Sequence, residues 1–112
     1  MYKVLLYQDK NGKSPIDKFI YKASKSVQIK ISKQIKYLEL FGLTRENPNL
    51  KKITGTQLWE VRILGKDNVR IICVAIVGNE IIIVNIFNKK KNKTPIKELK
   101  ISLMRYKDCV DI

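Results

Sequence analysis

The chain has 112 residues, 45% of them hydrophobic, which is the length and composition of a single globular domain with its own core. Its 23 Lys and Arg residues outnumber 10 Asp and Glu, and the formal net charge of +13 predicts a polyanionic partner: a nucleic acid, an anionic membrane surface or an acidic protein. The lack of histidine excludes His-based metal sites and every Ser-His or Cys-His nucleophile pair.

The first half of the sequence predicts one strand followed by two helices. Residues 2–7 are rich in β-branched and aromatic side chains, as a strand is. Ser14 and Pro15 are a typical N-cap and first helical residue, and a second helix is expected from a cap at Ser26 to an end at Gly42. The apolar positions expected to be buried are Ile16, Phe19, Ile20, Ala23, Val27, Ile31, Ile35 and Leu38. The lysines expected on the opposite face are Lys22, Lys25, Lys30, Lys33 and Lys36.

The second half predicts three strands and a last helix. We expect a loop over residues 45–56, and then strands over residues 57–64, 69–77 and 80–88. Thr94 and Pro95 repeat the cap-plus-proline signal, and the helix after them would point Ile96, Leu99 and Leu103 inward. The order β-α-α-β-β-β-α predicts one α+β domain over residues 1–112, with a small, mostly antiparallel sheet and the two N-terminal helices on one face.

Glu60, Arg62 and Arg70 are the first candidate site. Glu60 and Arg62 are two apart on a predicted strand and therefore point to the same face. Arg70 begins the next strand and lies near Arg62 if the register places it on that face. One interpretation is a cross-strand Glu–Arg pair on a solvated sheet face. The other is a phosphate site, in which the guanidinium groups grip a phosphodiester and Glu60 orients one of them.

A basic run directly after the last strand is the second candidate site. It consists of Lys89, Lys90, Lys91 and Lys93, with one asparagine between them. Such a cluster is either solvated surface or, given its place at the end of the sheet, part of one concave patch with the arginines. Repulsion among the cations also makes a neutral lysine available as a general base. The remaining candidate RNA contacts are Lys51, Lys52, Arg105 and Tyr106, the tyrosine being expected in an exposed, basic setting.

Other site classes find little support. Cys73 and Cys109 form no CxxC pair, and the ten acidic residues are too scattered for a Ca²⁺ loop or a two-metal cluster. The apolar run Ile71–Val77 is too short to span a bilayer, and the first residues do not resemble a signal peptide. We therefore expect a reduced, cytoplasmic protein with no metal, no cofactor and no membrane partner.

Four short segments, taken in order, carry a family resemblance. They are Leu58-Trp59-Glu60-Val61-Arg62-Ile63, Val69-Arg70-Ile71, Phe87-Asn88-Lys89-Lys90 and Lys93-Thr94-Pro95-Ile96-Lys97-Glu98. This ordered set, which covers residues 58–98, resembles the phage-derived HigB-type toxins of the RelE/ParE superfamily of bacterial toxin–antitoxin modules. The resemblance implies a RelE-like fold and a small ribonuclease that cuts mRNA in the ribosomal A site. It also implies a cognate antitoxin, commonly a HigA-like helix-turn-helix protein.

The resemblance also implies roles for single residues. Arg62 and Arg70 match sheet cations that hold the phosphate, and Lys89 or Lys90 matches the cation after the last strand. Glu60 stands where many RelE toxins carry a lysine, so the general base is left open between a desolvated lysine, Glu60 and a group of the ribosome. Lys89, Lys90 or Lys93 would protonate the leaving oxygen. The alternatives are a ParE-like gyrase inhibitor and a non-catalytic basic RNA-binding module.

Overall fold

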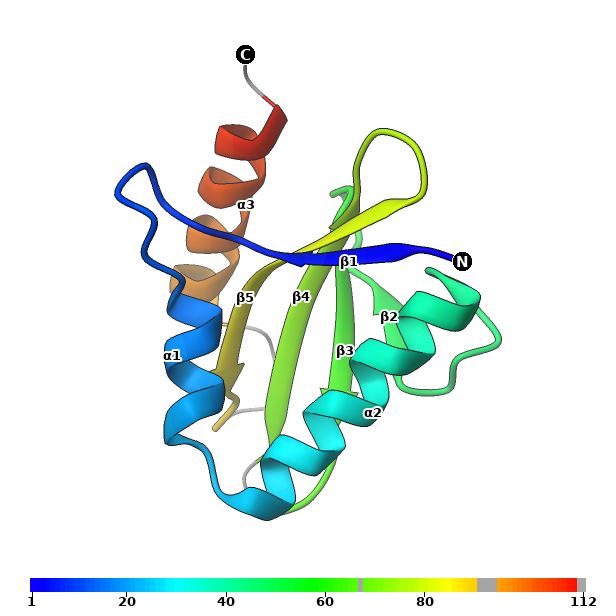
Figure 1. The fold of residues 1–112 in the computed structure, drawn as a ribbon, viewed down its shortest axis with the longest axis vertical. Helices are drawn as coiled ribbons and strands as arrows, with labels where there is room; N and C mark the ends of the chain where they lie inside the picture. Colours follow the sequence, from blue (N-terminus) through cyan, green and yellow to red (C-terminus); the bar gives the residue numbers. More distant parts are fainter. Residues whose placement is uncertain (67, 91–94, 111–112) are drawn as a thin grey trace.

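A five-stranded mixed sheet, which carries helices on both faces, forms the centre of the molecule in a computed structural model that describes residues 1–66, 68–90 and 95–110 (Figure 1). The strands are arranged β1-β5-β4-β3-β2, with β1 parallel to β5 and all other neighbours antiparallel. In chain order the elements are β1 (Lys3–Leu6), α1 (Pro15–Lys22), α2 (Lys25–Phe41), β2 (Leu50–Lys52), β3 (Trp59–Ile63), β4 (Val69–Ala75), β5 (Glu80–Asn88) and α3 (Ile96–Val110). The predicted α+β class is confirmed.

The strand β2 was not predicted, and it lies inside the segment expected to be a loop. It is only three residues long and pairs with β3 alone, through Leu50 opposite Val61 and Lys52 opposite Trp59. Because two of its three residues are lysines, the sequence lacks the apolar alternation that marks a strand. The order is therefore β-α-α-β-β-β-β-α.

The ends of the first two helices follow from capping. The Ser14 Oγ accepts a hydrogen bond from the Asp17 backbone N–H at 3.2 Å, as predicted, and Pro15 opens α1. Ser24, not Ser26, caps α2, because its Oγ accepts from the Val27 N–H at 3.2 Å. Gly42 ends α2 as predicted, with a φ of 72°.

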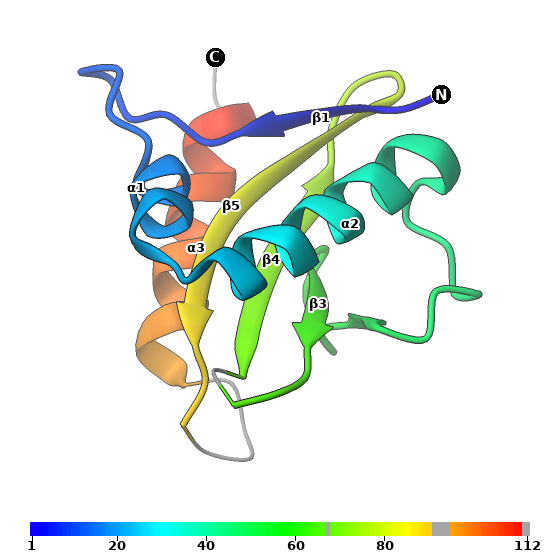
Figure 2. The ribbon, with the colours of Figure 1, turned by 60° about the horizontal axis from the view of Figure 1, so that its bottom comes forward.

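The helices α1 and α2 cover one face of the sheet, and α3 packs on the other (Figure 2). The side chains of successive β5 residues show this: Ile86 lines a cleft with α1, whereas the amide of Asn85 donates to Ser102 and Glu98 of α3. Among the described helices, none is long and apolar enough to cross a bilayer.

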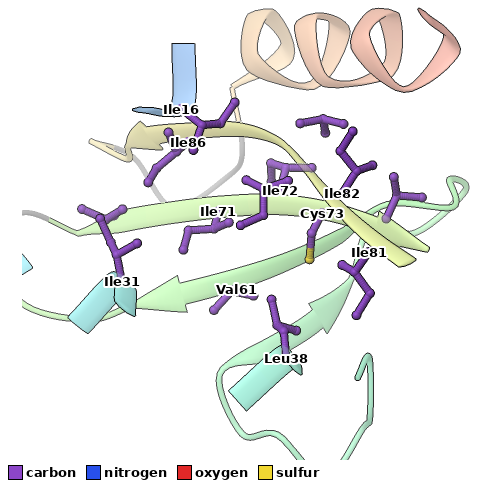
Figure 3. Packing of buried hydrophobic residues seen from close by; sticks show 14 of the residues in the cluster. Ile16, Ile31, Leu38, Val61, Ile71, Ile72, Cys73, Ile81, Ile82 and Ile86 are labelled. Carbon is purple, nitrogen blue, oxygen red and sulfur yellow. The ribbon is translucent and has the colours of Figure 1, made fainter. Parts of the chain in front are cut away.

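Core side chains fill the space between the sheet and the first two helices (Figure 3), and others, such as Ile72 and Phe87, lie on the face that α3 covers. Ile16, Ile31 and Leu38 are almost fully buried against strand residues such as Val61 and Ile71, so the predicted stripes of α1 and α2 are confirmed. None of the lysines expected on their outer faces is buried: Lys22, Lys25, Lys30, Lys33 and Lys36 are all exposed.

The inward face of α3 differs from the prediction. Ile96 is 72% exposed and Leu103 38%, whereas the half-buried Leu99 packs on the core and Ser102 is the one fully buried residue that the helix contributes. The Ser102 Oγ donates to the Glu98 carbonyl at 2.7 Å and accepts from Asn85, so a polar contact sets the rotation of the helix. A hydrophobic pattern does not report such a contact.

Candidate functional site

The two candidate arginines face each other across neighbouring strands. Arg62 of β3 lies directly opposite Arg70 of β4. Glu60 lies on the same face two residues earlier, and Lys51 of β2 lies opposite Glu60. Arg70 in turn lies opposite Phe87, which is two residues from Asn85 on the face that α3 covers. The register therefore gathers one carboxylate and three cations on this face.

Arg70 and Glu60 form a buried ion pair. The Arg70 Nε is 3.6 Å from the Glu60 Oε1, and each residue is only 5% exposed. One of the two interpretations was a cross-strand Glu–Arg pair on a solvated face. The pair is present, but the solvated setting is wrong, because its sheet neighbours on this face, Ile72 and Phe87, are buried apolar residues. Burial lowers the pKa of Arg70, while Glu60 raises it and Arg62 lowers it further. An arginine stays charged near neutral pH even so.

Asn68 joins the arginines to the start of the basic run. Its side-chain Oδ1 accepts from the Arg70 Nη1 at 2.8 Å, and its Nδ2 donates to the Lys89 carbonyl at 2.8 Å. The Lys89 N–H donates back to the Asn68 carbonyl at 2.8 Å. Asn68 adopts a φ of 49°, which asparagine tolerates better than most residues. The turn between β3 and β4 is thereby fixed to the segment that leaves β5.

The start of the basic run lies at the hairpin turn, because the Lys89 backbone is hydrogen-bonded to Asn68. Lys89 is half-buried and Lys90 exposed at this end of the sheet, whereas Lys91 and Lys93 lie outside the described residues. Asn68 was missed by sequence reasoning. Its signal was its position in the hairpin turn, two residues before Arg70.

Three other candidates are engaged elsewhere. Lys51 and Lys52 point to opposite faces of the sheet, and the Lys52 Nζ lies 5.1 Å from the centroid of the Trp59 ring on the helix side. Arg105 donates from Nη1 to the Val84 carbonyl at 2.9 Å, and it stacks on Tyr7. Tyr106 is half-buried and its hydroxyl is hydrogen-bonded to Gln57, so its expected exposure is wrong.

A comparison with known protein families gives a match over most of the chain. The model of the family described as phage-derived protein Gp49-like matches residues 18–107, from the first helix almost to the end of the last. The chain is a Gp49-like protein. This family is associated with toxins of the RelE/ParE kind. No curated protein matches the chain significantly.

The site of this Gp49-like protein consists mainly of cations beside one buried carboxylate. Across the described residues, no three Cys, Asp or Glu side chains gather closely enough to hold a metal ion. Two adjacent guanidinium groups, by contrast, offer planar forks of N–H donors that match phosphate oxygens. Arg62 is the more accessible of the two: it is half-buried, and no ion pair to it is found among the residues that the structure describes.

Proposed function

We propose that this Gp49-like protein is the toxin of a type II toxin–antitoxin system: a HigB-type, ribosome-associated endoribonuclease that cuts mRNA in the cytoplasm. The observation that carries the proposal is the register of β3 and β4, in which Arg62 lies opposite Arg70 beside the buried Glu60. The membership of a toxin-associated family and the net charge of +13 support it independently.

The proposed reaction is an internal transesterification that needs no metal. The 2′-hydroxyl of the RNA attacks the adjacent phosphorus, and the bond from phosphorus to the 5′-oxygen breaks. The products are a 2′,3′-cyclic phosphate and a 5′-hydroxyl. Negative charge builds on the non-bridging oxygens, where Arg62 and Arg70 would stabilise it. Cations fixed in place before the reaction contribute several kcal/mol in such a role.

The two arginines would contribute differently. Arg62 is the more exposed and would contact the phosphate directly. Arg70 is held by Glu60, Asn68 and the Val69 carbonyl, so its charge is fixed before the RNA binds. That fixation would keep a positive charge in place behind Arg62, near the reacting phosphate, without an entropy cost at the moment of reaction.

Proton transfer would use the basic run. Lys89, Lys90 or Lys93 would donate a proton to the leaving 5′-oxygen, and the base would be a desolvated lysine, Glu60 or a ribosomal group. Lys51, on the same face beside Glu60, would contact a neighbouring phosphate, and Lys91 would do so from the run itself.

The proposed partner is a HigA-like antitoxin that docks on the first two helices. A cleft of about 460 Å³ between these helices and one end of β4 and β5 supports this docking site. It combines apolar side chains, among them Phe19, Val27 and Ile86, with Lys18 and Lys22. An acidic segment with apolar anchors is complementary to such a cleft.

Mapping of RNA ends in cells tests the function. We expect induction of the wild-type protein to arrest growth and to create new 5′ ends within translated mRNA, detected by primer extension. Arg62→Ala should abolish both effects, and Arg62→Lys should restore them only in part, because an ammonium group cannot form the bidentate fork. Arg45→Ala is the matched control, because Arg45 stacks on Trp59 on the opposite face.

Three results would contradict the proposal. Unchanged cleavage by a folded Arg62→Ala variant would remove the phosphate role of this residue. Gyrase-dependent DNA breaks without new RNA ends would indicate the ParE-like activity. Salt-sensitive RNA binding with neither effect would leave a non-catalytic binding module.

A further inference from the structure

A basic groove runs along the edge of β3, beside the candidate site. It consists of two adjoining cavities of about 230 Å³ each, which share Lys30, Ile63 and Leu64 in their walls. The groove forms where β2 stops. The pairing of β2 with β3 ends at Val61, so residues of α2, and not of a further strand, lie beside the last residues of β3. We call this feature the edge groove.

The walls of the edge groove are cationic. Lys30 and Lys33 come from α2, Lys66 from the turn between β3 and β4, and Arg62 from β3 itself. No acidic residue is among the wall residues that the structure describes. The Lys30 ammonium lies over the turn, since a Cβ at Gly65 would be only 3.2 Å from its Nζ. A ligand of this groove is therefore an anion.

Two polar atoms at the groove lack partners. The Gln34 Oε1 and the Arg62 Nε are both buried, and neither has a hydrogen-bond partner among the described residues. Buried polar atoms are nearly always satisfied in folded proteins, and each exception requires an explanation. If these side chains turned toward the groove, a phosphate would accept from Nε and a ribose hydroxyl would donate to Oε1, so a sugar–phosphate unit offers both kinds of group.

The edge groove is continuous with the candidate site. Arg62 belongs to both, and Asn68, which binds Arg70, lines the groove at its other end. An RNA strand whose phosphate lies against Arg62 can therefore extend into the groove without leaving the protein surface.

We propose that the edge groove binds the sugar–phosphate backbone of the nucleotides that flank the cleaved phosphate, with Lys30 and Lys33 as phosphate contacts. This inference rests on the proposed function and adds a second binding region to it. The groove would then set how strongly longer RNA is bound, whereas the site at Arg62 and Arg70 would hold the cleaved phosphate itself.

Binding of uncleavable RNA tests the groove. Fluorescence anisotropy would be measured with labelled 2′-O-methyl oligonucleotides of three and nine nucleotides, which lack the attacking hydroxyl. The test variant is Lys30→Ala/Lys33→Ala. The matched control is Lys25→Ala/Lys36→Ala, which removes the same charge from exposed positions of the same helix outside the groove.

We expect the test variant to bind the nine-nucleotide probe roughly 10- to 30-fold more weakly at about 0.1 M salt, with a salt slope smaller by about 1.4, because two phosphate contacts are lost. The three-nucleotide probe should bind within about twofold of the wild type, and the control variant should lose little with either probe. Circular dichroism would check that both variants fold.

Equal losses in the test and control variants would overturn the groove, since they would reflect net charge alone. An equal loss for both probes in the test variant would also overturn it, because the lysines would then act at the cleaved phosphate. A wild-type protein that binds neither probe and creates no RNA ends in cells would overturn the proposed function itself, and that result differs from the other two.

Discussion

Arg62 and Arg70 share one register position but not one environment. Arg70 is held on several sides by Glu60, Asn68 and a backbone carbonyl, whereas Arg62 lies at the boundary between the sheet face and the edge groove. A buried charge loses its hydration and depends on its partners, while a half-buried one remains free to meet a ligand. The same residue type therefore contributes mainly to stability at one position and mainly to binding at the other.

This difference leads to a stability prediction. Arg70→Ala should lower the free energy of unfolding by about 2–3 kcal/mol, because the buried Glu60 carboxylate loses its cation. Arg62→Ala should lower it by less than about 1 kcal/mol. Urea denaturation of both variants measures the two values. Equal losses would show that the Glu60–Arg70 pair has no special role in the fold.

Cys73 leads to a pH prediction. Complete burial raises the pKa of its thiol from 9.0 to about 12. Between these pH values the folded state keeps a proton that the unfolded state has lost, so the free energy of unfolding should fall as pH rises, by up to about 1.4 kcal/mol per pH unit. Below pH 9 both states are protonated and the effect disappears.

The measurement compares urea unfolding of the wild type and Cys73→Ala from pH 8 to 10.5. The variant should lose stability less steeply above pH 9, since the other groups that titrate there are common to both proteins. Cys109→Ala is the control, because that thiol is only half-buried, and it should follow the wild type more closely. Parallel curves for all three proteins would contradict the prediction.

At the scale of elements, α3 is attached to the sheet through polar groups as well as through the apolar packing of Leu99, Tyr106 and Cys109. β5 contains a bulge opposite β4. Ile72 of β4 pairs with Asn85 and the next residue, Cys73, pairs with Ile83, so Val84 of β5 has no partner on β4. Arg105 of α3 donates a hydrogen bond to the Val84 carbonyl at this bulge. The helix is therefore held in place at a bulge in the strand.

This attachment leads to a prediction about α3. Arg105→Met should lower the free energy of unfolding by about 1–2 kcal/mol, because the Val84 carbonyl loses its donor. It should also speed amide hydrogen exchange in α3 more than in α2. Lys107→Met, an exposed change on the same helix, is the control and should do neither. Uniformly faster exchange in both helices would argue against a local attachment.

Sequence patterns predicted the elements whose burial is apolar and missed those that depend on polar contacts. The alternation in β3, the apolar runs of β4 and β5 and the stripe of α2 all follow from hydrophobic period, and all are present. β2 has only three residues, two of them lysines, so it shows no apolar alternation that would predict a strand. The rotation of α3 depends on Ser102 and Asn85, whose contact no local pattern reveals.

The candidate site was predictable to a similar degree. Strand period predicts that Glu60 and Arg62 share a face, whereas the face of Arg70 depended on the register, and the structure places Arg70 directly opposite Arg62. The burial of the Glu60–Arg70 pair and the bridge through Asn68 were not predictable, because both depend on residues distant in sequence, such as Phe87 and Lys89.

At the scale of the whole molecule, the net charge of +13 makes salt the variable that separates two modes of antitoxin binding. If the antitoxin docks in the cleft lined by Phe19 and Val27, affinity should change little between about 0.05 and 0.5 M salt, because apolar burial dominates. If it covers Arg62 and the basic run, affinity should fall steeply over that range.

We predict the weak salt dependence, because the cleft offers apolar anchors and the arginine face few. Isothermal titration of the antitoxin at several salt concentrations measures it. Phe19→Ala should weaken the complex by about 1–3 kcal/mol, whereas Arg62→Ala should leave it nearly unchanged. A steep salt dependence together with a silent Phe19→Ala would overturn helix docking.

The parallel pairing of β1 with β5 joins the first strand of the chain to its last, and this determines when the sheet can be completed during synthesis. Lys3 pairs with Glu80, so the first strand to leave the ribosome has no partner until the last strand has been made. β5 also lies between β1 and β4, and it carries the Phe87 that lies opposite Arg70. A nascent chain released before that point lacks the strand that joins the two parts of the sheet. The sheet face that carries Arg62 and Arg70 is therefore completed only when residues 80–88 have been made, late in the translation of a 112-residue chain.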